Sequence, residues 1–563
     1  MERRFLFALL LTGAVMLLTP VVFPRRTASP PPTARVDSSI AVVGGDKGAA
    51  PAAPAAAAPG PVTPSATSAT SAAAARSARG EMTRASAAES VSVLAGMSSY
   101  LFTTMGAVPL AVRVDSYPAL NGQGGRVVLR HGREPLIRFR VLAAGDTLAL
   151  DRIVYRAVRG TAGDSAETLT FTGVSGSTPV TVRYEFAANN YLATASVEVI
   201  GVESPAYLLV DLPSGFDTQE TDSVGDMRSL AYAVKPVTQG ARGTSFGSLD
   251  AGERKLESGP LSWAVAKSKY FLVGLLVPRG RTPFAEAHLE GGVRTQKIAT
   301  NGRATVVVPL ENGKTVFEIY AGPQSWERLH ALEREFETAN PYGGWMQPLV
   351  QPFATIVMRV LLWMKRQSHL GYGWVLVIFG IVIRLLLWPL NQGAMRTSIR
   401  MQRIQPELTA INTRYKGDPQ KLQQEMMRVY KEHGMSPFSA FSGCFPMLLP
   451  MPVFFALFFV FQNTIEFRGV PFLWMADISL PDPIYILPLV MGASMFLLSW
   501  IGMRNSPPNP QAKMMMYMMP VMFTVFLLWT AAGLSIYYLT SNLASLPQQW
   551  LIANERAKAK EKR

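Results

Sequence analysis

The sequence predicts a polytopic α-helical membrane protein with six transmembrane helices and an inserted all-β sandwich domain. Of its 563 residues 48% are hydrophobic and only 17% are charged, whereas about 25% charged residues is usual for soluble domains. Long apolar stretches occur at the N-terminus and beyond residue 345, and short alternating segments lie between them. One cysteine and five scattered histidines leave no disulfide framework and no metal-ligand spacing. We therefore expect neither a metal site nor catalytic residues.

The N-terminal part predicts a membrane anchor followed by a linker. A basic start precedes the apolar run Phe5–Phe23, which is either a cleaved signal peptide or an uncleaved anchor. No small-residue cleavage site follows, and the run is long enough to span a bilayer. We predict an anchor over 1–24. Residues 25–90 are rich in Ala, Pro, Ser and Thr, and such a composition predicts a disordered linker.

Residues 91–325 predict the all-β sandwich. Apolar and polar residues alternate from Val180 to Phe186, as in a strand with one buried face. Asn312-Gly313 separates two apolar segments and predicts a hairpin with a left-handed turn. No run in this region is long enough to cross a membrane.

The remaining chain predicts five more spans and the parts that connect them. The uncharged stretch 514–552 is nearly twice the length of one span, so it should reverse near Ala531-Ala532-Gly533. The predicted parts are a connecting segment with an amphipathic helix at the membrane surface (326–370), transmembrane helices over 371–391, 438–463, 484–503, 514–530 and 533–552, a cytoplasmic helical hairpin (392–437) and a basic tail (553–563).

The distribution of basic residues predicts the orientation. Loop 392–437 holds eight Lys or Arg residues against four acids, and the tail from Glu555 holds five basic residues. Basic loops stay on the cytoplasmic side, so both termini should be cytoplasmic and the β domain extracytoplasmic. This assignment requires that segment 345–366 does not span the membrane. Its polar stripe of Gln347, Gln351, Thr355 and Arg359 favours a helix lying in the interface.

Arg384 is the only charged residue in the span 371–391. It lies seven residues before Asn391, about 10 Å along a helix. A guanidinium at that depth costs at least about 3 kcal/mol and cannot be deprotonated. A water-filled indentation open to the cytoplasm would remove most of this cost. The alternatives are a side chain that snorkels to the surface and a structural ion pair.

Loop 392–437 predicts an antiparallel helical hairpin. Its apolar residues follow a spacing of three and four, and Asp418-Pro419 marks a helix start. The loop is either a solvated charged surface or a docking arm for a ribosome, a targeting factor or an anionic lipid surface. The candidate docking residues are Arg396, Arg400, Arg403, Arg414, Lys416, Lys421, Arg428 and Lys431.

Enzymatic functions find no support in the sequence. It contains no Ser/His/Asp set, no phosphate-binding loop and no acid or histidine within the spans. We therefore expect neither an enzyme nor a cofactor. A channel or solute transporter with Arg384 as its anion site remains an alternative function.

Several segments resemble the YidC/Oxa/Alb membrane protein insertases, in the form that Gram-negative bacteria have. They are Gly443-Cys-Phe-Pro-Met-Leu-Leu-Pro-Met-Pro-Val-Phe-Phe-Ala-Leu, Gln424-Glu-Met-Met-Arg-Val-Tyr-Lys, Asp482-Pro-Ile-Tyr-Ile-Leu-Pro and Gly533-Leu-Ser-Ile-Tyr-Tyr-Leu-Thr-Ser-Asn-Leu. The resemblance is dense over 345–553 and weaker in the β domain, where Trp263 and Lys269-Tyr-Phe carry it.

The resemblance implies a five-helix insertase core with an intramembrane groove that is open to the cytoplasm and contains Arg384. It also implies substrate contacts at Met451, Phe454 and Tyr538. Two positions depart from the family pattern: Pro450 replaces a glutamine, and Gly380 replaces a hydroxyl residue one turn before the arginine. Other polar groups could substitute, and the candidates are Gln462, Ser541 and Asn542.

The function that the resemblance implies is insertion and folding of nascent membrane proteins in the bacterial inner membrane, alone or with the Sec translocon. The hairpin and the basic tail would contact the ribosome, signal-recognition targeting components and membrane lipids. Family members carry a periplasmic sandwich that is similar to sugar-binding and mutarotase folds. Because His131 and His288 are isolated in the sequence, with no evident acid–histidine set, we expect no sugar chemistry there.

Overall fold

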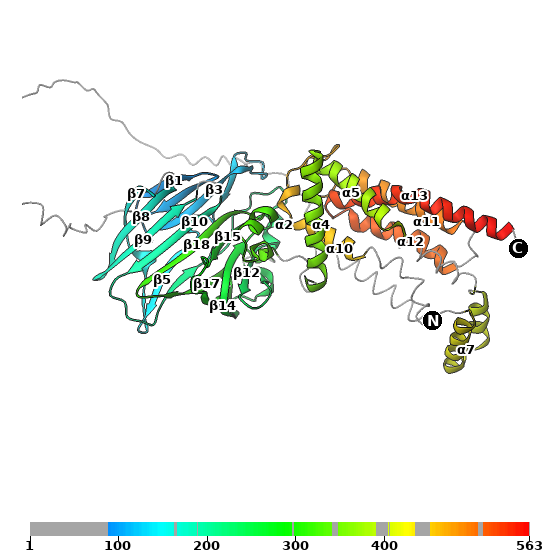
Figure 1. Cartoon of the computed structure of the whole chain (residues 1–563), viewed down its shortest axis with the longest axis horizontal. Coiled ribbons are helices and arrows are strands. Elements are labelled where there is room, and N and C mark those ends of the chain that lie inside the picture. The colour runs from blue at the N-terminus through cyan, green and yellow to red at the C-terminus, as the bar shows by residue number, and fades with distance from the viewer. Residues whose placement is uncertain are drawn as a thin grey trace, which may run out of the picture. The chain divides into compact units, whose positions relative to one another are not determined.

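The computed structural model consists of an all-β region followed by a helical region (Figure 1). It describes residues 88–162, 166–187, 190–294, 298–340, 347–389, 404, 406–433, 451–504 and 510–561. The two regions confirm the predicted division into a β domain and a helical C-terminal part. The predicted anchor 1–24 lies outside the described residues, as does nearly all of the linker.

Among the described residues, the strands of the β region fall into two sheets. One sheet is four-stranded, in the order β1 (Ser90–Ala95), β2 (Ser98–Thr103), β3 (Val108–Pro118) and β4 (Arg126–Leu129). The other has fourteen strands: β5 (Arg138–Ala143), β6 (Asp146–Leu148), β7 (Arg156–Ala162), β8 (Ala166–Ser175), β9 (Thr178–Phe186), β10 (Leu192–Val199), β11 (Ala206–Asp211), β12 (Ala231–Pro236), β13 (Arg242–Ser245), β14 (Arg254–Lys267), β15 (Phe271–Leu276), β16 (Phe284–Gly291), β17 (Gly302–Leu310) and β18 (Lys314–Pro323). The short helices α2 (Ser223–Arg228) and α3 (Trp326–Ala331) flank these strands.

The long strand β14 divides the larger sheet into two leaves. Its first half, up to Leu261, pairs with β16, and its second half, from Trp263, pairs with β15. The register shifts between Ser258 and Leu261, next to Gly259-Pro260, and such an irregularity bends a strand. The first leaf therefore runs β6-β5-β11-β17-β16-β14, and the second runs β14-β15-β18-β10-β9-β8-β7, with β12 beside β14 and β13 at its edge.

The two leaves bury their alternating apolar residues against each other. On β9, Val180, Val182, Tyr184 and Phe186 are all buried, as the alternation predicts. Phe139 on β5 of the first leaf and Phe317 on β18 of the second make an edge-to-face contact with ring centroids 6.0 Å apart. One apolar cluster contains core residues from both leaves and from the four-stranded sheet, so the β region has a single packed core.

The turn predicted at Asn312-Gly313 forms, but the hairpin prediction is wrong. Asn312 and Gly313 have φ values of 52° and 75°, and Glu311 and Lys314 exchange backbone hydrogen bonds of 2.9 and 3.0 Å. Beyond this bridge, β17 pairs with β11 and β16, whereas β18 pairs with β10 and β15. The turn therefore connects the two leaves, and the strands on either side of it enter different leaves.

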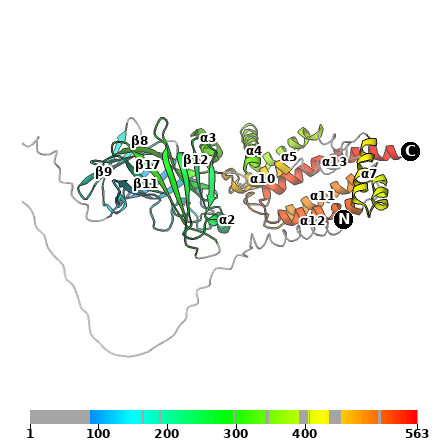
Figure 2. The same ribbon diagram turned by 90° about the horizontal axis from the view of Figure 1, so that it is seen from below.

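Among the described residues, the helical region contains one bent pair, α4 and α5, and five further helices. The bounds are α4 (Gln347–Ser368), α5 (Tyr372–Leu386), α7 (Pro419–Glu432), α10 (Met451–Asn463), α11 (Ile486–Met503), α12 (Pro510–Leu527) and α13 (Ala532–Glu561). Helix α13 packs against α5 and α11, and α12 packs beside α11 (Figure 2). Helix α13 continues without a break to Glu561, so the predicted basic tail begins within the same helix as the predicted last span.

Among the described residues, α11 alone is long and apolar enough to cross a bilayer by itself. Helices α4 and α5 meet that criterion only together, and they are bent by 117° at their junction. The segments Val453–Asn463 and Lys513–Leu527 are shorter apolar helices. On α4, the buried Ala354, Met358 and Leu361 contribute to the core of the helical region, whereas Phe353, Ile356 and Trp363 remain exposed.

The segment between α10 and α11 packs against the β region through buried polar contacts. Arg468 Nε lies 2.8 Å from Glu220 Oε2, and both side chains are at most 5% exposed. Arg468 Nη1 also donates to Pro118 O at 2.9 Å, and the Tyr270 hydroxyl bonds to Ser479 Oγ at 3.1 Å. Arg468 Nη2 has no hydrogen-bond partner among the described residues, and a buried ion pair stabilises only when its remaining hydrogen bonds are satisfied. These contacts therefore specify how the segment fits the β region more than they stabilise it.

Glu466 in the same segment is half-buried and has no basic partner among the described residues. Its Oε1 accepts hydrogen bonds from Ser325 Oγ at 3.0 Å and from the Trp326 backbone at 3.1 Å. Burial raises the pKa of this carboxyl from its ordinary 4.5 to about 7. Between these two pH values the folded protein binds more protons than the unfolded chain, so this group lowers stability as the pH rises through that window.

We expect Glu466→Gln to raise thermal stability at pH 8 and to have little effect near pH 5. The glutamine stays neutral, so the full-length variant should gain about 2 kcal/mol of unfolding free energy at pH 8. This gain is smaller than the free energy that corresponds to the complete pKa shift, because the side chain is only half-buried. Thermal unfolding at both pH values measures this difference. The exposed control Glu185→Gln should show no pH-dependent gain. A wild type that is more stable than Glu466→Gln at pH 8 would contradict the assignment.

Gly313→Ala should destabilise the β region more than Gly176→Ala does. Both glycines have positive φ, 75° and 63°, and a side chain at either position costs about 1 kcal/mol. At Gly313 an added Cβ would also overlap the carbonyl oxygen of Val199, whereas Gly176 has open space. We expect a loss of about 3 kcal/mol at 313 and about 1 kcal/mol at 176 by thermal unfolding. Equal losses would show that the turn makes no close contact with β10.

Candidate functional site

Arg384 lies near the C-terminal end of α5 and is half-buried. Its Nη2 donates to Gln548 Oε1 on α13 at 3.4 Å, and Gln548 Nε2 donates to the Trp388 carbonyl at 3.3 Å. Gln548 itself is 2% exposed. The Arg384 Nε is buried and has no hydrogen-bond partner among the described residues. The guanidinium is therefore held at one edge by an amide and has an unused donor.

No ion pair of the described chain involves Arg384. Tyr537 on α13 interacts electrostatically with Arg384. Among the described residues, the structural ion pair that the sequence left open is absent. An arginine with an amide partner keeps its full charge, so it can interact with an anionic or polar group that enters from outside.

Side chains on different sides of α13 contact different helices. Tyr537 and Gln548 lie toward Arg384, and Tyr538 faces the aromatic side chains of α10 and α12. Asn542 Nδ2 donates to Ser494 Oγ on α11 at 3.0 Å. Of the polar candidates, Asn542 therefore holds α11 and α13 together, and Ser541 is adjacent to Tyr537.

The glycine that departs from the family pattern has a packing role. A Cβ at Gly380 would lie 3.2 Å from Thr540 Cβ and 3.3 Å from the Tyr537 carbonyl. Helix α13 therefore approaches α5 closely at this point, one turn before Arg384. Thr540 uses its hydroxyl for a 2.8 Å bond to the Ile536 carbonyl of its own helix. A larger residue at 380 would separate the two helices that position Arg384 and Gln548.

Phe454 and Tyr538 lie together in an aromatic cluster formed by α10, α12 and α13. Their ring centroids are 5.6 Å apart, and Phe523 and Phe526 of α12 lie 6.0 and 5.8 Å from Phe454. Edge-to-face and tilted contacts of this kind stabilise a wall of rings without fixing one arrangement. Met451 is the first residue of α10. Pro450 lies outside the described residues.

Gln462 is not brought near Arg384. It lies one residue before Asn463, whose carbonyl accepts a 2.8 Å hydrogen bond from Asn340, beyond the β strands. At the other end of α5, Tyr372 contacts Phe467, just after α10, with ring centroids 5.2 Å apart. Gln462 therefore lies at the end of α10 that leads to the first turn of α5, whereas Arg384 lies near the last turn of α5.

The described part of the hairpin consists of helical residues 406–414 and α7. Asp418 caps α7 by accepting from the Lys421 backbone at 3.1 Å, and Ile404, Leu408, Val429 and Tyr430 form a small buried core. Over 406–433 five basic residues face four acids, and Arg428 pairs with both Glu425 and Glu432. Arg414, Lys416, Lys421 and Lys431 are the other described docking candidates, whereas Arg396, Arg400 and Arg403 lie outside the described residues.

The structure brings acids to His288 and His131, which looked isolated in the sequence. His288 Nε2 lies 2.7 Å from Glu286 Oε1 on the same strand face, and His131 Nδ1 lies 3.9 Å from Asp217 Oδ1. The residues of the first pair are two positions apart on one strand, so both side chains lie on the same face of the sheet. The second joins residues far apart in the sequence and depends on tertiary packing.

Sequence reasoning missed Gln548. The only signal for it is that an amide occurs eleven residues after Tyr537, at helical spacing on the same face, within a stretch that has no charge. Tyr430 of the hairpin core was also missed. Val429 continues the apolar spacing of three and four residues, and Tyr430, as the next residue, does not belong to that pattern.

Comparisons with known proteins assign this chain to a family. Residues 363–560 match the family described as 60Kd inner membrane protein, and residues 119–356 match the YidC periplasmic domain. The membrane protein insertase YidC of Anaeromyxobacter sp. (strain Fw109-5) is 30% identical over 407 residues, which cover 70% of this chain and 71% of that protein. The insertase of Azotobacter vinelandii is 31% identical over 61% of this chain and 59% of its own length.

A solved structure of a YidC insertase with its first transmembrane domain covers 82% of this chain and 92% of its own chain, at 18% identity and a TM-score of 0.34. The sequence matches extend over both the β region and the helical region. The chain belongs to the YidC family of membrane protein insertases.

Proposed function

We propose that this chain inserts nascent membrane proteins into the bacterial inner membrane through a hydrophilic groove that opens to the cytoplasm and contains Arg384. The observation that carries the proposal is a half-buried guanidinium that has an amide partner and no acidic partner among the described residues. The family acts without catalysing a chemical reaction, so the physical task is to lower the free-energy cost of moving polar peptide across a bilayer.

Arg384 suits this task because its charge is positioned and still available. An acidic partner would satisfy the guanidinium permanently, and with no partner at all its position would be poorly determined. Gln548 orients one edge through an uncharged bond and leaves the Nε donor unused. A polar or acidic segment of a nascent chain would gain a charge-assisted hydrogen bond with the exposed part of the Arg384 side chain, and it would replace water that hydrates the groove.

The aromatic cluster provides the apolar side of the proposed groove. Phe454 and Tyr538 would contact the hydrophobic segment of a client while its polar flank lies near Arg384, and Met451 begins the helix that carries this wall. Because one helix, α13, carries both Tyr537 on the polar side and Tyr538 on the aromatic side, a client can meet both environments at once. It could then leave sideways into the lipid.

We further propose a chain with six spans, cytoplasmic termini and a periplasmic β region. The 117° bend between α4 and α5 supports α4 as a separate surface helix, and its exposed Phe353, Ile356 and Trp363 would face the lipid interface. The helical tail carries Arg556, Lys558 and Lys560. Together with the hairpin, this tail would contact the ribosome, targeting components and anionic lipids. The protein would insert its clients either alone or together with the Sec translocon, and it would also act as a chaperone in their folding.

Replacing Arg384 with Ala should reduce insertion of clients that have acidic translocated tails by about tenfold or more, because their partner in the groove is lost. Arg384→Lys should retain most activity, since the ammonium is also cationic. Insertion into proteoliposomes, measured by protease protection of the client tail, tests both variants. Clients with uncharged tails serve as the matched control and should be affected less. Wild-type activity of Arg384→Ala on acidic tails would remove Arg384 from the mechanism.

A photoreactive phenylalanine derivative at position 538 should crosslink to a stalled nascent membrane protein. The same derivative at Trp500, which is exposed on α11, should crosslink weakly because it faces the lipid. Crosslinked nascent chain on a gel is the readout. If reconstituted protein conducted solutes and position 538 never crosslinked a nascent chain, a channel or transporter with Arg384 as its anion site would replace the insertase mechanism.

A further inference from the structure

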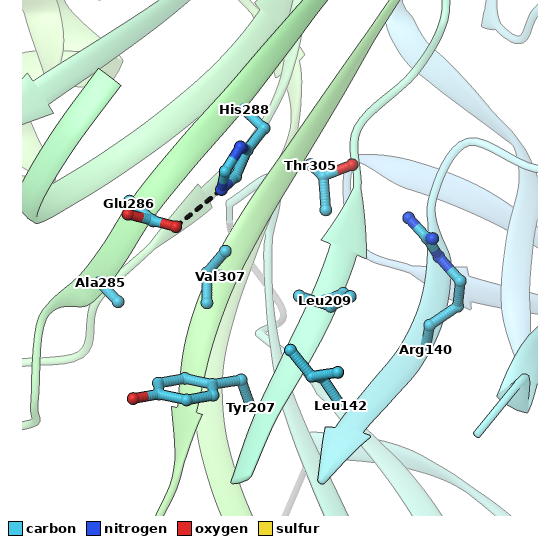
Figure 3. Close-up of a pocket in the computed structure, with 9 residues that line it drawn as sticks. All are labelled: Arg140, Leu142, Tyr207, Leu209, Ala285, Glu286, His288, Thr305 and Val307. Carbon is cyan, nitrogen blue, oxygen red and sulfur yellow. Dashed lines mark hydrogen bonds and ion pairs between the residues drawn. The ribbon is translucent and has the colours of Figure 1, made fainter. Parts of the chain in front are cut away.

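The first leaf of the β region carries a pocket on its outer face. The pocket has a volume of about 520 Å³ and lies across four neighbouring strands, β5, β11, β17 and β16 (Figure 3). The nine lining residues are Arg140, Leu142, Tyr207, Leu209, Ala285, Glu286, His288, Thr305 and Val307. The volume falls within the range of about 300–1,000 Å³ that is usual for small-molecule sites.

The strand register explains how these side chains surround a small apolar floor. Leu209 on β11 pairs with Arg140 on one side and with Val307 on the other, and Val307 pairs with Glu286. Leu209 and Val307 therefore form the floor between Arg140 and the Glu286–His288 pair, as Figure 3 shows. Tyr207 lies at one end of this floor. Their neighbours along each strand, such as Phe139 and Val306, are buried in the core.

The polar groups around the floor are already positioned by one another. Arg140 Nη2 donates to Asp211 Oδ1 at 2.7 Å, and Thr305 Oγ1 donates to the same oxygen at 2.5 Å. His288 Nε2 lies 2.7 Å from Glu286 Oε1. The Arg140 Nε is buried without a hydrogen-bond partner among the described residues. Each charged pair retains further donors or acceptors, so the rim offers both kinds of group over a short distance.

We propose that this pocket binds a neutral saccharide. A sugar hydroxyl both donates and accepts hydrogen bonds, which matches a rim of guanidinium, imidazole, hydroxyl and carboxylate groups, and a sugar also has an apolar face that can lie on the Tyr207 ring and the aliphatic floor. Arg140 is balanced by Asp211, and Glu286 adds a negative charge beside His288. This balance disfavours an anion such as phosphate or a lipid headgroup.

The position of the pocket also disfavours an extended peptide as the ligand. Peptides that bind to sheets usually add a strand at an edge with free backbone groups. Each of the four strands here has a hydrogen-bonded neighbour on both sides, in the order β6-β5-β11-β17-β16-β14. Recognition must therefore use side chains, and these are the groups described above. The pocket is separate from Arg384 and from the aromatic cluster, so the proposal does not depend on the insertase mechanism.

Saturation-transfer difference NMR on the full-length protein tests the proposal. The protein is held in lipid nanodiscs free of glycoside detergent, because the sugar of a maltoside would itself compete. The probes are maltose, cellobiose and diacetylchitobiose, with inorganic phosphate and a short apolar peptide as comparisons. We expect saturation transfer to at least one neutral disaccharide, and no displacement of that disaccharide by phosphate or the peptide.

Two variants and one control assign the signal to the pocket. Tyr207→Ala should weaken binding about tenfold, because it removes the ring on which the sugar lies. Glu286→Gln, at a partly exposed position, should weaken it severalfold, because it removes the carboxylate beside His288. The control Glu198→Gln removes an exposed ion pair with Lys314 in the second leaf and should bind as wild type. Absence of transfer to every disaccharide, displacement by phosphate or by the peptide, or unchanged binding in Glu286→Gln would each overturn the proposal.

Discussion

A cation that cannot lose its proton, held inside an apolar helical region, is the constraint on which the proposed groove depends. Arg384 is half-buried on α5, and its only side-chain hydrogen bond among the described residues is to the amide of Gln548. A guanidinium in a dry bilayer interior costs at least about 3 kcal/mol. The surroundings must therefore supply water or a transient partner, and in the proposed function the client supplies that partner.

The neighbouring features are consistent with this requirement. The close contact at Gly380 brings α13 against α5, so that Tyr537 and Gln548 lie beside the guanidinium. On another side of α13, Tyr538 joins the aromatic wall with Phe454. Outside the helices, Arg468 meets the opposite condition, since its charge is buried against Glu220 and satisfied by a carbonyl. Arg384 has only an amide partner, whereas Arg468 has a carboxylate partner, although Arg468 Nη2 also lacks a hydrogen-bond partner among the described residues. The charge of Arg384 is therefore left without a counter-charge, and this difference separates a binding role from a structural one.

Local signals in the sequence predicted local structure well. The alternation on β9, the cap at Asp418 and the break that precedes α13 each depend on a few neighbouring residues. The destinations of β17 and β18 could not be predicted, because the Asn312-Gly313 turn is compatible with a hairpin and with a connection between leaves. The sequence identified Arg384, Phe454 and Tyr538 as candidates, but the Gln548 contact and the displaced position of Gln462 follow from helix packing, which spacing does not encode.

Aqueous accessibility at position 384 tests the central claim most directly. In a chain with Cys444 replaced by serine, Arg384→Cys and Val382→Cys place a thiol at nearly the same depth on opposite sides of α5, and Val382 is exposed on the helical surface where lipid would lie. A membrane-impermeant thiol reagent applied from the cytoplasmic side should modify position 384 quickly and position 382 slowly. Equal protection of both thiols would contradict a hydrated groove and would leave Arg384 in dry packing.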